Sequence, residues 1–199
     1  MGFADWLRQR TGIPIPDDPV TDEEIVGFAH TLIDPAFLTL DQVEEDVREV
    51  LELDADDPRG TTLVQQVWAE RLDQQSTWTD QGDYDRLSAA FAELEDRGIV
   101  GRMNFTCCQT CGHAEIEDER SPGSRGYTFF HSQDADQLAP GGSDLFLAYG
   151  SFGSDSEEAI GVEIAEVLGR HGLSVEWSGS VEQRIGVTRL DWRKRLPTG

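Results

Sequence analysis

Apolar residues recur every three or four positions through the first half of the chain, and this spacing predicts amphipathic helices. Two of the helices are expected to begin with a capping box, in which a Thr and a Glu or Gln three residues later bond each other's backbone amides: Thr21 with Glu24, and Thr39 with Gln42. Pro58 and Gly60 interrupt the pattern, which resumes after Gly60 and again over residues 83–97. Helices therefore account for residues 21 to about 98.

Beyond Gly98 the apolar positions take the period of strands. Runs at residues 99–106, 127–131, 145–149, 173–177 and 185–190 predict strands, and residues 157–170 predict one helix, capped by Ser154 and Glu157. The second half therefore reads β-β-β-α-β-β. The predicted fold class is α+β, a helical N-terminal half followed by a mostly antiparallel sheet with one crossing helix.

Three segments follow from these patterns. Residues 1–20 are predicted to form an N-terminal arm, residues 21–100 a helical region, and residues 101–199 an α/β sheet region. No Pro-, Gly- or Ser-rich linker separates the last two, so one integrated domain is the alternative.

The charge narrows the function classes. With 39 acidic and 16 basic residues the formal net charge is −23, which would repel phosphates and argues against nucleic acid. We interpret the basic residues near the C-terminus as partners of the acidic helices. No apolar run approaches a membrane span and no secretory signal is evident, so we expect a cytoplasmic protein without a membrane partner.

All three cysteines lie within five residues, as Cys107, Cys108 and Cys111. Cys108-x-x-Cys111 is typical of a metal-binding knuckle, because two thiolates at this spacing can grip one tetrahedral ion. The glycine that follows, Gly112, is predicted to allow a tight turn beneath the ion. Cys107 is expected to point away if the segment is extended, since neighbouring side chains then alternate.

Two histidines are candidates for the remaining positions of a four-ligand site. His113 follows the knuckle closely, and His131 ends the strand predicted as the hairpin partner of the cysteine segment. The predicted metal ligands are thus Cys108, Cys111, His113 and His131, with zinc as the candidate cofactor.

Ordinary buried thiols and a redox-active dithiol are the alternatives. A reactive thiol needs a lowered pKa, commonly from a helix N-terminus or a cation. No helix is predicted to begin here, and the acidic residues after Cys111 would raise a thiol pKa. Both points disfavour redox chemistry.

Four blocks of the chain, taken together, resemble an uncharacterised, mainly actinobacterial family with a domain of unknown function. The blocks begin at Phe105 (FTCCQTCGHAEI), Tyr127 (YTFFHSQD), Leu145 (LFLAYGSF) and Leu190 (LDWRKR). The resemblance covers about residues 61–196, and Cys-Cys-x-x-Cys-Gly is its most distinctive part. It implies a cytoplasmic bacterial protein and carries no activity or cofactor.

No complete catalytic constellation stands out in the sequence. Our first hypothesis is therefore a non-enzymatic accessory protein that acts through a protein partner. The alternative is a metal-binding or thiol-based enzyme centred on the Cys108-x-x-Cys111 cluster.

Overall fold

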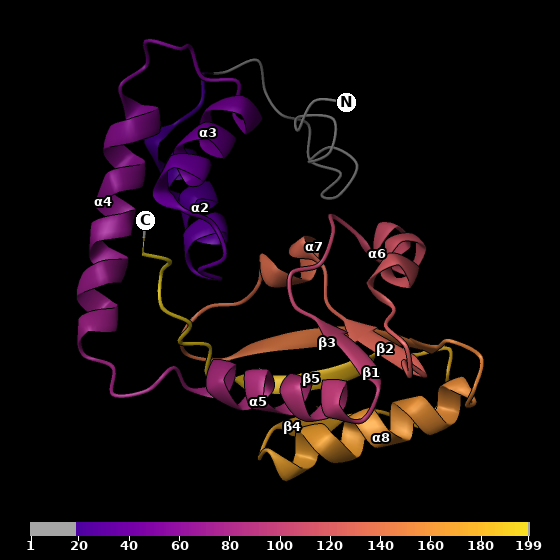
Figure 1. Cartoon of the computed structure of the whole chain (residues 1–199). Helices are drawn as coiled ribbons and strands as arrows, with labels where there is room; N and C mark the ends of the chain where they lie inside the picture. Colours follow the sequence, from indigo (N-terminus) through magenta and orange to yellow (C-terminus); the bar gives the residue numbers. More distant parts are fainter. Residues whose placement is uncertain (1–18, 199) are drawn as a thin grey trace. The chain divides into compact units, whose positions relative to one another are not determined.

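A computed structural model describes residues 19–198 (Figure 1). The described residues divide into two compact units, residues 19–77 with 195–198, and residues 78–194. The helix at residues 83–96 groups with the sheet in this division. The predicted arm, apart from its last two residues, lies outside the described residues.

The first unit contains α2 (Asp22–Ile33), α3 (Leu40–Val50) and α4 (Arg59–Ser76). Both predicted capping boxes are confirmed, at Thr21 before α2 and at Thr39 before α3. The predicted break between α3 and α4 is confirmed, with Pro58 as the N-cap of α4, but Gly60 lies in the first turn of α4 and not in the break. A Cβ at Gly60 would lie 3.0 Å from the Arg48 side chain, so α3 and α4 meet closely there.

One apolar cluster holds this unit together. Each helix buries residues three or four positions apart, and the returning C-terminal segment adds Leu196. The members contributed by the helices are Ile25, Ala29, Ile33, Val43, Val47, Val64 and Val67. The Gln75 side chain accepts a hydrogen bond from the Leu196 amide at 2.9 Å and so fixes the returning segment to α4.

The second unit is built on a sheet. Its elements are α5 (Asp83–Asp96), β1 (Ile99–Arg102), α6 (Gln109–Glu115), η1 (Ile116–Glu119), β2 (Gly126–Phe129), α7 (Ser132–Ala135), β3 (Ser143–Ser151), α8 (Glu157–Arg170), β4 (Ser174–Glu176) and β5 (Ile185–Leu190). The five strands of this unit are ordered β1-β2-β3-β5-β4. Every neighbouring pair is antiparallel except β1 and β2, so the predicted α+β class is confirmed. Helices α5 and α8 cover one face of the sheet, and α6 and α7 lie on the other (Figure 1).

The parallel pairing of β1 with β2 corrects one prediction. The cysteine segment and the strand before His131 were expected to form a hairpin, but Ile99 pairs with Gly126 and Arg102 with Phe129 in parallel. Parallel neighbours need a crossover, and α6 and η1 provide it where a hairpin loop was expected.

A second correction concerns the start of α8. Ser156, not Ser154, caps this helix, and its side chain accepts a hydrogen bond from the Ala159 amide. The helix itself begins at Glu157, as predicted.

A carboxylate occupies one backbone donor at the outer edge of β1. Glu95, at the end of α5, accepts a hydrogen bond from the Gly101 amide at 3.0 Å. Arg102 pairs with both Glu95 and Glu119, which fixes the Glu95 carboxylate at this edge.

Candidate functional site

The cysteines lie where the chain leaves β1 and enters α6. Two residues of this loop, Asn104 and Thr106, have left-handed backbones with φ of 50° and 59°. Asn adopts this conformation more readily than most residues, but it is strained for a β-branched Thr, so surrounding contacts must hold Thr106 in place.

Backbone hydrogen bonds to the segment after β2 supply those contacts. The Phe105 amide donates to the Phe130 carbonyl at 2.8 Å, and the Ser132 amide donates to the Thr106 carbonyl at 3.1 Å. The Ser132 hydroxyl donates to the Cys107 carbonyl at 3.3 Å. The loop is therefore anchored immediately before the thiols.

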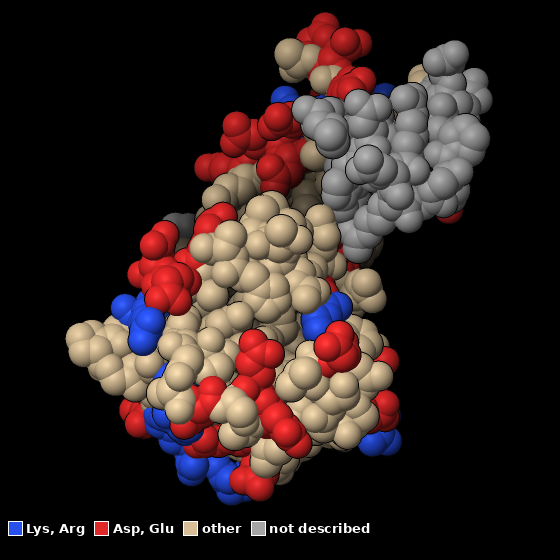
Figure 2. Space-filling view, turned by 90° about the vertical axis from the view of Figure 1, so that its right-hand side faces the viewer, with Lys and Arg blue, Asp and Glu red and all other residues tan. Residues whose placement is uncertain are grey.

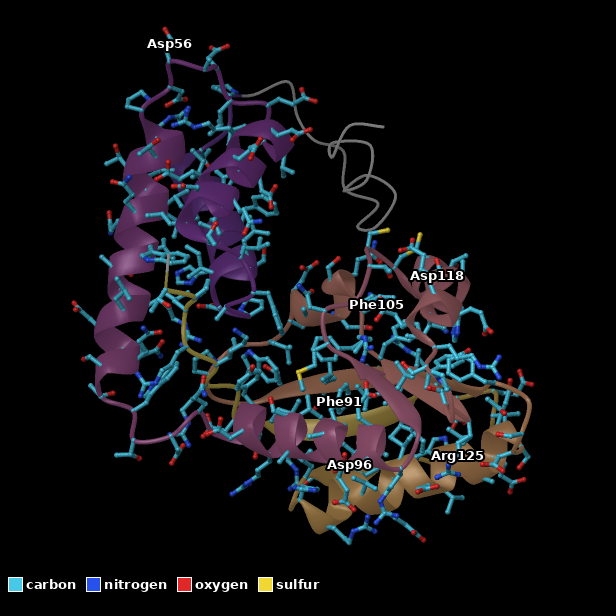
Figure 3. The ribbon with its side chains drawn as sticks, viewed as in Figure 1. Asp56, Phe91, Asp96, Phe105, Asp118 and Arg125 are labelled. Atoms are coloured by element: carbon cyan, nitrogen blue, oxygen red, sulfur yellow. The ribbon has the colours of Figure 1, made fainter. Side chains whose placement is uncertain are left out.

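The three thiols converge. The sulfur atoms of Cys107, Cys108 and Cys111 all lie within 4.8 Å of one another, and no other such group of His, Cys, Asp or Glu occurs in residues 19–198. Cys107 Sγ is 3.5 Å from Cys111 Sγ. Cys107 is exposed and the other two are half-buried. Figure 3 shows sulfur atoms near the start of α6, above Phe105. Three close cysteines such as these can hold a metal ion.

Cys107 is therefore part of the cluster, contrary to the expectation for an extended strand. The segment is not extended, because the left-handed Thr106 precedes Cys107 and α6 begins directly after Cys108. The alternation of side chains fails, and the turn before α6 brings Cys107 Sγ to within 3.5 Å of Cys111 Sγ.

The helix start also corrects the expectation that none begins at the cysteines. Cys108 is the N-cap residue of α6, a position for which Ser, Thr, Asp and Asn are the usual signals. With a sulfur atom in place of an oxygen, the pattern did not predict a helix.

Contacts within the cluster shift the pKa values of Cys108 and Cys111 in opposite directions. Hydrogen bonding from the Cys111 amide, and next from the Cys111 thiol, lowers the pKa of Cys108. The Cys108 sulfur, and then the Cys107 sulfur, raise the pKa of Cys111 to about 12. Cys108 therefore ionises before Cys111, and a thiolate at Cys108 opposes a second negative charge on Cys111.

Gly112 acts through close packing. It is buried within α6, and a Cβ there would overlap Phe129 Cε2 and Cζ and lie 3.1 Å from Cδ2. The prediction of a tight turn at this glycine is wrong, because the residue is helical. Its missing side chain lets α6 rest directly on the ring of a strand residue.

His113 lies one turn along α6 from Gln109. Its Nδ1 is 3.0 Å from the Tyr127 hydroxyl, and its Nε2 is 3.4 Å from the Gln109 side-chain amide. The ring packs edge-on against Phe129 and Tyr127, and desolvation lowers the pKa of the imidazole. His113 is not among the three converging ligand groups.

His131 caps α7. Its Nδ1 accepts a hydrogen bond from the Asp134 amide at 3.2 Å, and its Nε2 is 3.0 Å from an Asp134 carboxylate oxygen. The same carboxylate pairs with Arg184. Of the four predicted ligands, the structure brings together Cys108 and Cys111, with Cys107 as the unpredicted third group.

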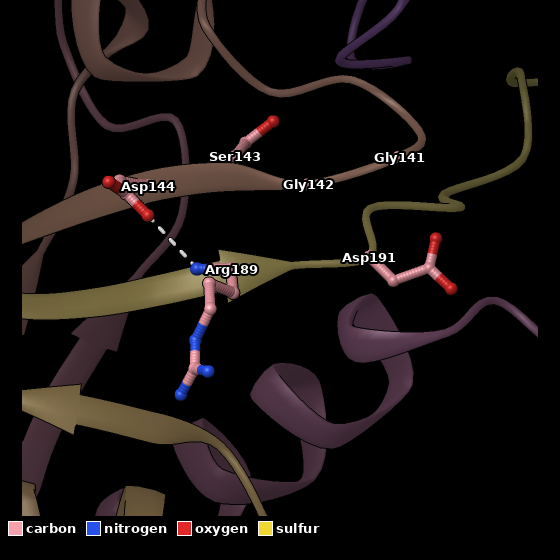
Figure 4. A pocket seen from close by; sticks show the side chains of 6 residues that line it. All are labelled: Gly141, Gly142, Ser143, Asp144, Arg189 and Asp191. Carbon is pink, nitrogen blue, oxygen red and sulfur yellow. Dashed lines mark hydrogen bonds between the residues drawn. The ribbon is translucent and has the colours of Figure 1, made fainter.

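A second candidate is an open depression of about 570 Å³ where β3 begins and β5 ends (Figure 4). Gly141, Gly142, Ser143, Asp144, Arg189 and Asp191 line it. The charged groups there have structural partners. Asp144 accepts the Arg189 backbone amide at 2.9 Å, the Arg189 side chain reaches Ser174, and Asp191 pairs with Arg193. We therefore place the candidate chemistry at the cysteines.

Two basic residues near the C-terminus pair with acidic residues, but only the partner of Arg184 lies in a helix, α7. Arg184 binds Asp134, and Arg193 binds Asp80 and Asp191. On the face drawn in Figure 2, acidic side chains predominate over basic ones. No helix within residues 19–198 combines the length and apolar character needed to cross a membrane.

The family described as a domain of unknown function (DUF6891) matches residues 18–196. The chain belongs to this family. The match extends well before residue 61, where the resemblance noted in the sequence began, so the helical unit is part of the DUF6891 domain. No curated protein and no solved structure matches the chain.

Proposed function

We propose that this DUF6891 protein binds a thiophilic metal ion, zinc foremost, through the thiolates of Cys107, Cys108 and Cys111. The convergence of the three sulfur atoms within 4.8 Å carries the proposal. Thiolates favour zinc, copper(I) and iron–sulfur chemistry over hard cations such as magnesium.

The spacing suits the ion. Two thiolates on a tetrahedral zinc with bonds of about 2.3 Å lie about 3.8 Å apart. The 3.5 Å separation of Cys107 from Cys111, and the 4.8 Å limit on the other pairs, bracket that value. Side-chain rotations that move the sulfur atoms by a few tenths of an ångström to about 1 Å would therefore bring all three to zinc-bonding distance.

The ion would also relieve the repulsion between the thiolates. The pKa of Cys111 rises to about 12 because two other sulfurs adjoin it. A divalent cation among the sulfurs favours all three thiolates and displaces their protons. An open fourth position on zinc is typical of catalytic sites, which leaves room for a water, a substrate or a partner's ligand.

Elemental analysis of the full chain, purified without chelator, tests the proposal. We expect about one zinc per chain, loss of the metal in Cys108→Ser and Cys111→Ser, and weaker binding in Cys107→Ser. Ala114→Ser is the matched control, because it adds a hydroxyl at an exposed position of α6 without touching the cluster. A folded wild-type chain that takes up no zinc in a competition titration would sink the proposal.

The predicted imidazole ligands enter the same experiment. His113→Ala and His131→Ala each remove one candidate for the fourth position. A variant that weakens zinc binding tenfold while keeping the fold would support that histidine as a ligand. The partners that both imidazoles have in the structure favour unchanged binding.

Thiol–disulfide exchange is a second candidate function, favoured by the lowered pKa of Cys108 beside the raised pKa of Cys111. The more acidic thiol of such a pair attacks a substrate disulfide, and the other resolves the mixed disulfide. Alkylation of Cys108 as a function of pH tests it. A midpoint at or above the ordinary thiol value would contradict the redox role.

Several broader expectations stay proposals. The acidic surface, with a net charge of −23, supports action without nucleic acid. A cytoplasmic accessory role through a protein partner fits a metal-bound loop that presents a fixed surface. An actinobacterial origin and the cysteine block as a family hallmark also stay predictions.

A further inference from the structure

The geometry points to a second covalent state of the cluster, a disulfide between Cys107 and Cys111 that forms on oxidation by a peroxide and expels the bound ion. This inference rests on the proposed metal binding and adds its regulation. It begins from the 3.5 Å separation of the two sulfurs.

The distance suits a disulfide, and solvent access favours Cys107 as its first sulfur to react. A disulfide bond is about 2.0 Å long, so the sulfurs need to approach by about 1.5 Å, within reach of side-chain rotation. Cys107 is exposed and can meet an oxidant in solvent, whereas Cys108 and Cys111 are half-buried. Cys108 is left as a single thiol at the start of α6.

The backbone around Cys107 is prepared for either state. Thr106, left-handed at φ 59°, sets the direction of the chain, and Ser132 bonds the carbonyls of Thr106 and Cys107. These bonds involve main-chain atoms, so the Cys107 side chain can turn from the ion toward Cys111 without breaking them.

The chemistry balances with hydrogen peroxide as the oxidant. The Cys107 thiolate attacks one peroxide oxygen, the O–O bond breaks, and a sulfenic acid and hydroxide result. The Cys111 sulfur then attacks the Cys107 sulfur, so the S–S bond forms and the S–O bond breaks. Overall, two thiols and one peroxide give one disulfide and two waters.

Loss of the ion follows from the ligand count. The disulfide removes two of the three thiolates at once, and a single thiolate from Cys108 cannot hold zinc in competition with water. Oxidation and metal occupancy are therefore mutually exclusive at this site. A reducing agent would restore the ligands.

Two measurements on the zinc-loaded full chain test the inference. A chromogenic chelator records zinc release after peroxide addition, and mass spectrometry of the same sample records the loss of two hydrogens. We expect both to proceed together. Residues 103–120 follow Arg102, end at Arg120 and contain all three cysteines, so fragmentation of this tryptic peptide after labelling of the remaining thiol identifies that thiol. The label is expected on Cys108.

Cysteine variants of the metal-free chain show which two cysteines form the disulfide. Cys108→Ser keeps Cys107 and Cys111, and should form the internal disulfide fastest. At about 10 μM protein, an effective thiol concentration of the order of 1 mM makes internal closure about 100-fold faster than dimer formation. Cys107→Ser, which keeps Cys108 and Cys111, is the matched comparison and should close more slowly.

The results separate the two proposals. If the chain binds zinc but its thiols resist peroxide, the proposed disulfide is overturned and metal binding stands. The same follows if the label is found on Cys107 in place of Cys108. Faster closure in Cys107→Ser than in Cys108→Ser overturns the assignment of the pair. A reduced chain that never binds zinc overturns the metal proposal, whatever disulfide it forms.

Discussion

Replacing Gly112 by Ala tests how closely α6 rests on the sheet. Ala is the better helix former by up to about 1 kcal/mol, so helix propensity alone predicts a gain in stability. The added Cβ would overlap ring carbons of Phe129, which is fully buried, and the ring or the helix would have to move by about 1 Å. Overpacking of this kind costs about 1–3 kcal/mol. We therefore expect Gly112→Ala to lose about 1–2 kcal/mol net.

The assay is urea unfolding followed by circular dichroism, with Gly169→Ala as the matched control. Gly169 lies in α8, and a Cβ there meets nothing within 4 Å. This variant should gain about 0.5–1 kcal/mol. Replacing the ring by a smaller side chain should also relieve Gly112→Ala, so combining it with Phe129→Leu should cost less than the two single losses added. If Gly112→Ala proved as stable as Gly169→Ala, the close-packing argument would be refuted.

Three further outcomes are expected. Bonding to Arg170, and next to His171, lowers the pKa of Glu93 to about 2 from 4.5, so this carboxylate stabilises the fold above about pH 4.5 and that contribution disappears as the pH falls toward 2. The difference in Tm between wild type and Glu93→Gln should therefore narrow on acidification, and a constant difference would contradict it. Thr39→Ala should lose about 1 kcal/mol in urea unfolding, unlike Thr62→Ala at an exposed position within α4. Zinc affinity, measured by chelator competition, should rise from about pH 6 to pH 8, because the ion displaces thiol protons; a flat profile would exclude thiolate ligation.

Local signals predicted most of the fold. The capping boxes at Thr21 and Thr39 and the helical spacing of apolar residues placed α2 and α3, and period-two alternation indicated the strands. Strand pairing is a long-range property, and the chain carries no local sign that β1 and β2 run parallel. The crossover helix that makes this pairing possible was missed, since α6 has only seven residues and its N-cap residue is a cysteine.

The sequence predicted where the candidate site lies, but not all of the residues that form it. The spacing of Cys108 and Cys111 identified the right loop. The position of Cys107 was predicted wrongly because it depends on the left-handed backbone of Thr106. Hydrogen bonds with the segment that follows β2 stabilise that conformation, and a Thr in the sequence gives no sign of it. His113 was chosen because it is near the cysteines in sequence, and His131 because of the predicted hairpin. In the structure the imidazole of His113 contacts the Tyr127 hydroxyl, and that of His131 caps the N-terminus of α7.

The Glu95 carboxylate at the edge of β1 has a consequence beyond this chain. An outermost strand normally offers unused amide donors to any extended peptide that approaches, which is how sheets of separate molecules fuse. At Gly101 that donor is already occupied, and the acidic group that occupies it would repel another acidic chain. Removing the Glu95 carboxylate would leave the Gly101 amide unoccupied, and β1 could then pair with an edge strand of another copy of the protein.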